Sequence, residues 1–395
     1  MSNPKDFIYL SKMSELADWR PEDIEIQASK VSNTPLLGRP PPPPPTRIPT
    51  ATPIPNLLSC HDFQGGYHAY ESAQGQFRPP ASSNPIYTAA HLHLIDTFIY
   101  FSHKLVTIPP SPWINTLHRN GVRALGTFLV ESGDGSTALS RLLDKGSEGE
   151  YIFATQLALI AETYGFDGWL INIEATFPGE SFVLGELQAF LRELRSGVAE
   201  LVPGGQVIWY DALTVRNQVN YQDGLSSLNA PFLGVTDGLF TNYGWREEKL
   251  EATRVMAKAM NRVTDIYTGI DCFGRGSLGG GGFGVGVALS AIRKAGTSAV
   301  LFAPGWTYES SGGKNFESVD RKFWVGDGSD VESNTQKPVS YFVSEKACGG
   351  SAFFFTNFNR GFGKGWWVDG VVRFVLCAPP TSCRADIECL RNRKS

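Results

Sequence analysis

The stretch YGFDGWLINIE, residues 164–174, decides how the fold of this chain is interpreted. Side chains alternate between two faces along a β-strand, so Leu170, Asn172 and Glu174 share one face and large apolar residues occupy the other. In a barrel the layer between strands and helices is dry, so the face with two polar members must point inward. We therefore predict that Asn172 and Glu174 lie side by side at the C-terminal end of this strand, where barrel enzymes keep their chemistry.

Seven further apolar, β-rich runs accompany this one, and helical periodicity separates several of them. The eight runs are 57–63, 97–102, 122–130, 168–174, 206–213, 238–245, 265–273 and 298–306, with the clearest helices at 151–164, 182–201, 247–262 and 287–295. Near-continuous hydrophobicity is typical of strands buried on both faces. The pattern predicts an α/β fold, a (β/α)8 TIM barrel over 57–336. A doubly wound sheet is the alternative, but the glycine-rich stretch 274–284 follows the seventh run, where it predicts a loop over the active face.

The two ends of the chain differ from this pattern. Residues 1–56 are interpreted as an extension with one short amphipathic helix from Phe7 to Trp19 and a stiff proline-rich linker. We expect the linker to be a plain spacer, with a ligand for an SH3-type partner as the alternative. Residues 337–395 are expected to be the start of an incomplete β-rich module and an irregular tail, as in a truncated chain.

Composition excludes several classes of function. A net charge of −4 without a long basic run predicts no nucleic-acid partner, and no apolar window is long enough for a membrane span. The N-terminus lacks a secretory signal, so we expect a cytoplasmic protein with reduced thiols. No metal is predicted, because Cys377, Cys383 and Cys389 lack a usual zinc spacing and because His91 and His93 lack a third ligand, which favours an exposed helix there.

One carboxyl beside one amide suggests a particular chemistry. Most glycosidases use two carboxylates, but here Asn172, a poor nucleophile, occupies the second position. A substrate sugar with a 2-acetamido group can supply its own nucleophile while Glu174 protonates the leaving oxygen and Asn172 accepts the acetamido N–H. The alternative is a buried structural pair, although unpaired carboxylates are rarely buried.

The same residues carry a family resemblance. DGWLINIE, residues 167–174, resembles the signature of glycoside hydrolase family 85, the endo-β-N-acetylglucosaminidases. It is also similar to the family 18 chitinase motif DG-x-D-x-D-x-E, from which it differs because Leu170 and Asn172 replace two acids. Further stretches that resemble family 85 are CHDFQGGY (60–67), FIYFSHKLVTIPPSPWIN (98–115), WYDALT (209–214), FTNYGWREE (240–248), YTGIDCFGRG (267–276) and LFAPGWTYE (301–309).

The resemblance implies a barrel that cleaves between the two core N-acetylglucosamines of N-linked glycans, glycopeptides or free oligosaccharides, without a cofactor, and that also transfers the sugar to acceptors. It implies that Tyr210 lies near the acetamido group as a catalytic residue. It further implies that Trp245, Trp306 and Tyr308 contact the sugar, and aromatic rings suit the apolar faces of pyranoses. A place in the barrel core is the alternative for Tyr210 and for the tryptophans.

Weaker candidates lie at the ends of other predicted strands. His61 and Asp62 end the first run and could contact sugar hydroxyls or serve packing, and the same alternatives hold for His103. Asp271 ends the seventh run and could line the glycan subsites. Asp167 precedes the fourth run and is expected to form hydrogen bonds with the backbone or to support Glu174 indirectly. Two other functions stay open, a chitinase-like hydrolase and an inactive glycan-binding form.

Overall fold

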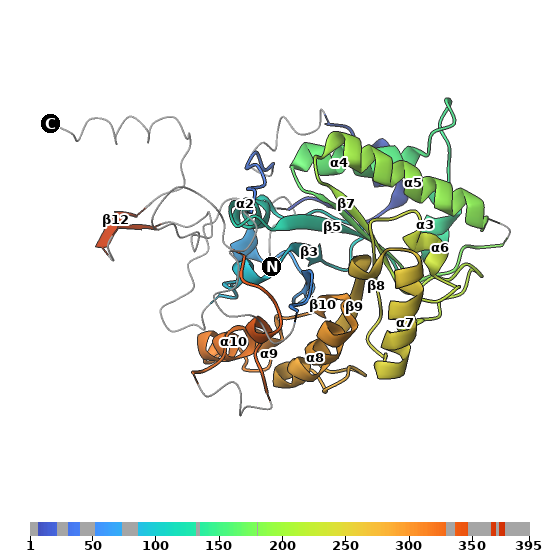
Figure 1. Ribbon diagram of the computed structural model, residues 1–395. Helices are drawn as coiled ribbons and strands as arrows, with labels where there is room; N and C mark the ends of the chain where they lie inside the picture. The colour runs from blue at the N-terminus through green and yellow to red at the C-terminus, as the bar shows by residue number, and fades with distance from the viewer. Residues whose placement is uncertain are drawn as a thin grey trace.

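The computed structural model describes residues 7–21, 31–39, 52–72, 86–131, 135–179, 181–328, 336–346, 365–368 and 371–375. Figure 1 shows a bundle of strands surrounded by helices. The proline run Pro40 to Pro45 and residues 351–358 of the expected β-rich module lie outside the described residues.

Eight parallel strands form a closed barrel. In order around the barrel they are β2 (Leu57–Asp62), β3 (Thr97–Phe101), β5 (Arg123–Val130), β6 (Gly168–Ile173), β7 (Gln206–Tyr210), β8 (Gly238–Phe240), β9 (Ile266–Asp271) and β10 (Ser298–Phe302). Pairing of β10 with β2 and of β5 with β6 completes the ring. The predicted (β/α)8 barrel is therefore confirmed. Several strands end before the predicted residue, because the chain turns into loops at the C-terminal face.

Helices cover the outside of the barrel (Figure 1). They are α2 (Ser111–Arg119), α3 (Gly135–Leu142), α4 (Ile152–Tyr164), α5 (Leu184–Leu201), α6 (Ala230–Leu233), α7 (Glu247–Ala259), α8 (Val285–Ala295), α9 (Trp306–Glu309) and α10 (Phe316–Trp324). The four clearest predicted helices are confirmed as α4, α5, α7 and α8. Helix α4 is followed by Gly165, whose φ of 77° is the left-handed conformation that ends the helix before β6.

The barrel separates two hydrophobic layers, and β6 shows how the sequence builds both. Leu170 packs inside the barrel with apolar side chains from neighbouring strands. Trp169, Ile171 and Ile173 pack outside, in the layer beneath the helices. The Trp169 indole N–H donates to the Leu157 carbonyl of α4 over 2.9 Å, which satisfies its polar atom in this dry layer. The predicted alternation along this strand is confirmed.

The N-terminal segment packs on the barrel. Strand β1 (Tyr9–Leu10) pairs antiparallel with β4 (Val106–Thr107), and only α1 (Met13–Asp18) is helical, so the prediction of one helix from Phe7 to Trp19 was too long. The side chain of Leu16 is fully buried in the outer layer. Apolar residues of this segment therefore cover helices α3 and α4.

Residues 31–39 run along the N-terminal face of the barrel. The Arg39 guanidinium donates to the carbonyl oxygens of Leu92, Ile95 and Asn120, at 2.7 to 3.0 Å. These acceptors lie in the connections that enter β3 and β5. One side chain thus joins two of the connections that lead into strands, at the end of the barrel opposite to the strand C-termini.

The first residues of the predicted C-terminal module also pack on the barrel. Val339 and Phe342 are buried in the outer layer, and Val343 forms a parallel bridge with Ile54. Farther along, β11 (Gly365–Val368) pairs antiparallel with β12 (Val371–Val375). The short 3₁₀ turns are η3 (Ala69–Glu71), η4 (Leu92–Leu94), η5 (Val263–Asp265), η6 (Gly282–Gly284) and η7 (Val339–Tyr341).

The expected exposed helix around His91 and His93 is instead the single turn η4. Both histidines are half-buried, and His91 Nε2 faces the Asp320 carboxylate at 3.5 Å. Burial and the neighbouring charge of His93 lower the pKa of His91 to about 4, so this imidazole is neutral at pH 7.

Candidate active site

A carboxyl and an amide meet at the C-terminal end of β6. The Asn172 Nδ2 donates to Glu174 Oε1 over 3.1 Å, and the Glu174 backbone N–H donates to the Val130 carbonyl over 2.7 Å. Asn172 is 3% exposed, whereas Glu174 is half-buried and open to the mouth of the barrel. The structure thus brings the two predicted residues together.

The hydrogen bond to Glu174 fixes the orientation of the Asn172 amide. The NH₂ group of Asn172 faces Glu174, so its carbonyl oxygen points elsewhere. That buried Oδ1 has no hydrogen-bond partner among the residues that the structure describes. Leaving a buried acceptor unpaired costs about 1–3 kcal/mol, so such an atom requires an explanation.

Tyr221 is the site residue that sequence reasoning missed. It lies in the loop after β7, and its hydroxyl donates to Glu174 Oε2 over 2.8 Å. Partial burial and the hydrogen bond to Glu174 raise the pKa of Tyr221, so the phenol keeps its proton. The surrounding loop has neither strand nor helix periodicity, and nothing in the sequence pattern marks this tyrosine.

Tyr210 lies at the end of β7 and points into the barrel. Its side chain is 6% exposed, and its hydroxyl donates to Asn242 Oδ1 over 3.1 Å. Burial and the nearby charge of Glu174 raise the pKa of Tyr210, which keeps this phenol protonated as well. The rings of Tyr210 and Tyr221 meet edge to face at 6.3 Å. Tyr210 therefore belongs to the same cluster as Glu174.

A hydrogen-bonded network supports both tyrosines from beneath. The Asn242 Nδ2 donates to Asp223 over 2.7 Å, and Asp223 lies two residues beyond Tyr221. Asp211 accepts from Asn229 over 2.8 Å, which fixes the other end of the same loop. Burial raises the pKa of Asp211 to about 7, and hydrogen bonds from Asn229, Gln222 and Asn242 offset only part of this effect. These contacts tie the loop that carries Tyr221 to the barrel wall.

The three other predicted aromatic residues lie outside the inner cluster that includes Tyr210. Trp245 is 2% exposed in the outer layer, where its indole N–H donates to the Gly269 carbonyl over 2.7 Å. Trp306 is the first residue of α9 and packs on Phe283. Tyr308, on the same short helix, meets Phe63 edge to face at 5.5 Å. None of the three packs with Tyr210 in the inner cluster.

Of the polar residues predicted at the ends of β2 and β3, His61 is buried in the outer layer, whereas Asp62 and His103 lie at the mouth. His61 lies on the outer face of β2, 1% exposed, with its ring against Phe98 at 5.2 Å, so it does not reach the mouth. Asp62 follows on the inner face and is half-buried, and this burial raises its pKa. Exposed His103 faces Glu131 at 3.2 Å on the rim.

Asp271 is fully buried at the end of β9 and does not line the mouth itself. Its Oδ2 accepts from the Nε of Arg275 over 2.7 Å and from the backbone N–H of Arg275 over 2.9 Å. Its Oδ1 accepts from Arg275 Nη2 and from the Phe273 backbone N–H. Asp271 thus organises the glycine-rich loop after β9 instead of presenting a free carboxylate.

Asp167 supports the opposite end of β6. Its carboxylate accepts from the Ala124 backbone N–H over 2.7 Å and from His118 Nε2 over 2.8 Å. The His118 Nδ1 faces the Thr34 carbonyl at 2.6 Å. Because both ring nitrogens face acceptors, both must carry protons. Burial alone would lower the pKa of His118, but the hydrogen bond and charge of Asp167 raise it overall.

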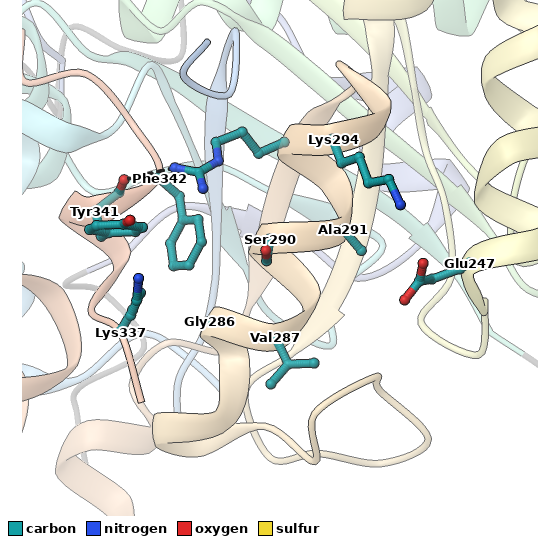
Figure 2. Close-up of a pocket in the computed structure, with 10 residues that line it drawn as sticks. Glu247, Gly286, Val287, Ser290, Ala291, Lys294, Lys337, Tyr341 and Phe342 are labelled. Atoms are coloured by element: carbon teal, nitrogen blue, oxygen red, sulfur yellow. Dashed lines mark hydrogen bonds between the residues drawn. The ribbon is translucent and has the colours of Figure 1, made fainter. Parts of the chain in front are cut away.

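A separate cavity lies on the outer wall of the protein. It has a volume of about 450 Å³ and is lined by α8 and by residues such as Lys337 and Phe342 (Figure 2). Glu174 does not contribute to its lining, so this cavity is not part of the site on β6 and β7.

Two further features are absent from the described part of the chain. No group of three His, Cys, Asp or Glu side chains there is placed to hold a metal ion. No helix in the same ranges combines the length and the apolar character that crossing a bilayer requires. Cys60 and Cys272, the cysteines that these ranges include, are buried free thiols.

Comparison with known proteins identifies the family. The sequence model of glycosyl hydrolase family 85 matches residues 67–366, so the barrel is that of a glycoside hydrolase family. The chain belongs to glycosyl hydrolase family 85.

Individual relatives agree with this assignment. The chain is 44% identical to the cytosolic endo-beta-N-acetylglucosaminidase of Gallus gallus, over 80% of this chain and 41% of the relative. It is 39% identical to cytosolic endo-beta-N-acetylglucosaminidase 2 of Arabidopsis thaliana, over 78% and 41%. The chain therefore spans about two fifths of the length of these curated relatives.

A solved structure shares the fold. The glycoside hydrolase domain of Endo-D from Streptococcus pneumoniae R6 superposes with a TM-score of 0.76 at 23% identity, over 93% of this chain and 59% of that one. At this level of identity the likeness concerns the fold.

Proposed function

We propose that this protein is an endo-β-N-acetylglucosaminidase that cleaves the β-1,4 bond of the N,N′-diacetylchitobiose core of N-glycans. The observation that carries the proposal is the Asn172 amide, whose Nδ2 is bound to Glu174 while its buried Oδ1 is left for a ligand. The names of the relatives, which match over most of this chain, support the same substrate class.

In the first step, the substrate attacks itself. The carbonyl oxygen of the 2-acetamido group forms a bond to the anomeric carbon, and the bond from that carbon to the leaving oxygen breaks. Glu174 gives its proton to the leaving oxygen, as a general acid. Asn172 Oδ1 accepts the acetamido N–H, which holds the group in the attacking position and stabilises the positive charge that develops on it. The product is a cyclic oxazolinium.

In the second step, Glu174 works as a general base. The carboxylate removes a proton from water, whose oxygen opens the oxazolinium ring with overall retention of configuration. A sugar hydroxyl can replace water, which gives transglycosylation. Tyr210 and Tyr221 contribute protonated phenols beside the reacting atoms, and both keep their protons because their pKa values are raised.

The chitinase-like alternative has less support. A relay of acids along the fourth strand would need a carboxylate where Leu170 points into the barrel. Leu170 packs there among apolar residues such as Leu129 and Ile208, which leaves no polar partner for such a relay. An amide at position 172 instead of an acid suits the proposed activity.

The natural substrate and location are also proposals. The curated relatives are named as cytosolic enzymes, and we infer the same location and N-linked glycans, glycopeptides or free oligosaccharides as substrates. The proposed reaction needs no cofactor, because Glu174, Asn172 and the substrate supply every group that reacts. The other alternative, a form that binds glycans without cleaving them, would show no turnover.

A direct experiment tests the activity. The protein is incubated with a high-mannose glycopeptide, and the products are weighed by mass spectrometry. Release of the glycan with one N-acetylglucosamine left on the peptide supports the proposal. An intact glycopeptide, or a peptide that has lost both N-acetylglucosamines, contradicts it.

A further inference from the structure

Arg275 lies in the loop after β9, at the rim of the barrel. Its side chain is held by Asp271 but remains largely exposed to solvent. Its guanidinium binds the Asp271 carboxylate through Nε at 2.7 Å and through Nη2 at 3.2 Å, while 66% of the side chain stays exposed. A guanidinium has five N–H donors in one plane, and this paired contact uses two of them. Three donors therefore face outward from a guanidinium whose orientation is set by a fully buried partner.

The surroundings of Arg275 have the composition of a sugar-binding surface. Its guanidinium carbon lies 5.8 Å from the ring centre of Phe302, at the end of β10, and 5.7 Å from that of Phe273, which is 43% exposed. The Asp62 carboxylate, at the end of β2, is close enough to interact electrostatically with Arg275. Aromatic rings, fixed donors and a carboxylate acceptor together suit the apolar faces and hydroxyl groups of a hexose.

This surface lies across the barrel mouth from the reacting groups. In the closed order of eight strands, β10 is separated from β6 by four positions in either direction, so their C-terminal ends are opposite. Phe302 ends β10, and Glu174 directly follows β6. A glycan cut at Glu174 has to extend beyond its two N-acetylglucosamines, and the opposite rim is available to its branches.

The charge of the rim favours an uncharged ligand. Asp271 neutralises Arg275 from beneath, and Asp62 interacts with the carboxylates of Glu131 and Glu309. His103 and His61 are the basic groups besides Arg275 whose charge acts on Asp62, and His61 is buried in the outer layer. Because Asp271 already pairs with Arg275, the carboxylates of Asp62, Glu131 and Glu309 remain at the rim and would repel a phosphate or carboxylate on the bound sugar.

We propose that Arg275, held by Asp271, forms with Asp62 and Phe302 a subsite for an uncharged hexose in a branch of the glycan. The inference rests on the proposed function, because it concerns the substrate of that same active site. Arg275 acts here in binding and has no role in bond cleavage. Its effect is therefore expected in KM.

The test compares two neutral glycopeptides, one with a branched high-mannose glycan and one trimmed to a single mannose on the chitobiose core. Arg275→Lys keeps a charge beside Asp271 but removes the planar fork. It should raise KM about tenfold on the branched glycan, as expected for one lost hydrogen-bonding contact, with kcat unchanged. KM and kcat of this variant should equal those of the wild type on the trimmed glycan. Arg254→Lys, whose partner Glu251 lies on the outer helix α7, is the matched control and should change neither.

Asp62→Asn gives a second, independent variant, because it leaves the buried Asp271 contact intact. It should raise KM on the branched glycan in the same way. A branched glycan that carries phosphate should be a poorer substrate than the neutral one for the wild type, and Asp62→Asn should narrow that difference.

The outcomes distinguish failure of the proposed subsite from failure of the proposed glycosidase activity. Equal KM changes on the branched and trimmed glycans, no change in either variant, or a preference of the wild type for the phosphorylated glycan would overturn the subsite alone. If the wild type cleaves neither glycan, the proposed function fails and the subsite with it.

Discussion

The hydroxyl of Tyr221 donates a hydrogen bond to Oε2 of Glu174 over 2.8 Å, so the proposed catalytic carboxyl is held from two sides. Asn172 approaches the other oxygen of the same carboxyl, from the strand itself. The loop after β7 and strand β6 therefore both contribute a hydrogen bond that orients the Glu174 side chain. The position of Glu174 depends on how firmly that loop is attached.

Removing the Tyr221 hydroxyl should slow the reaction without abolishing it. Tyr221→Phe keeps the ring but loses one hydrogen bond to a charged group, which is worth about 1.5–3 kcal/mol. We expect kcat/KM to fall roughly 10- to 100-fold, measured as glycan release from a glycopeptide. Tyr341→Phe, on the outer wall, is the control. An unchanged rate in Tyr221→Phe would show that Asn172 alone positions the carboxyl.

Replacing the carboxyl itself should have a larger effect. Glu174→Gln keeps the shape of the side chain but cannot donate a proton, and general acid–base catalysis is typically worth about 10²–10⁴-fold. We expect at least that loss of turnover on intact glycan, with glycan binding retained in calorimetry. Glu162→Gln, on the exposed side of α4, should turn over normally. Near-normal turnover of purified Glu174→Gln would remove this residue from the mechanism.

Asn172 can be tested with two donors in one variant. Asn172→Ala removes the acceptor for the acetamido N–H, so oxazolinium formation from intact glycan should fail. A preformed sugar oxazoline bypasses that step, and Glu174 remains to activate water or an acceptor. Product formation from both donors is measured by chromatography. An equal loss on both would mean that Asn172 acts only as a structural partner of Glu174.

Trp245 is expected to matter for stability and to have little effect on substrate binding. Trp245→Phe loses the hydrogen bond to the Gly269 carbonyl and part of a buried ring, at a cost of about 1–3 kcal/mol. The melting temperature should fall while KM for the glycopeptide stays the same. A raised KM at an unchanged melting temperature would indicate that Trp245 contacts the bound sugar.

The stability of the protein should depend on pH through His118. The pKa of His118 is raised in the folded state, so its contribution is complete below the ordinary histidine value and is lost as pH rises through the folded pKa. Urea unfolding at pH 6 should show His118→Ala less stable than the wild type by about 3 kcal/mol, since Asp167 is left buried without its partner. At pH 9 the difference should shrink. The same difference at both pH values would mean that His118 is uncharged in the fold.

The barrel could be predicted because strands buried on both faces have a recognisable sequence pattern. The alternation along β6 also placed Asn172 and Glu174, since a dry outer layer excludes polar side chains. Errors arose where strands end. Strand β8 ends at Phe240, so Trp245 lies well beyond it and turns into the outer layer.

The loops could not be predicted in the same way. Tyr221 and Asp223 reach the site through a loop with no periodicity, and only the folded arrangement brings them near Glu174 and Asn242. His61 and Asp62 show a further difficulty, because a shift of one residue moves a side chain to the other face of a strand. Asp271 was a candidate for lining the glycan subsites, but its side chain is fully buried and accepts hydrogen bonds from Arg275.

The contacts of Arg39 have a consequence for how such a protein changes over time. They fasten the connections at Leu92, Ile95 and Asn120, at the end of the barrel opposite to the loops that surround Glu174. Mutations that lengthen or reshape the loops of the mouth do not alter these hydrogen bonds of Arg39. New substrate preferences can therefore arise by variation at one end of the molecule while the other end preserves the stability that tolerates them.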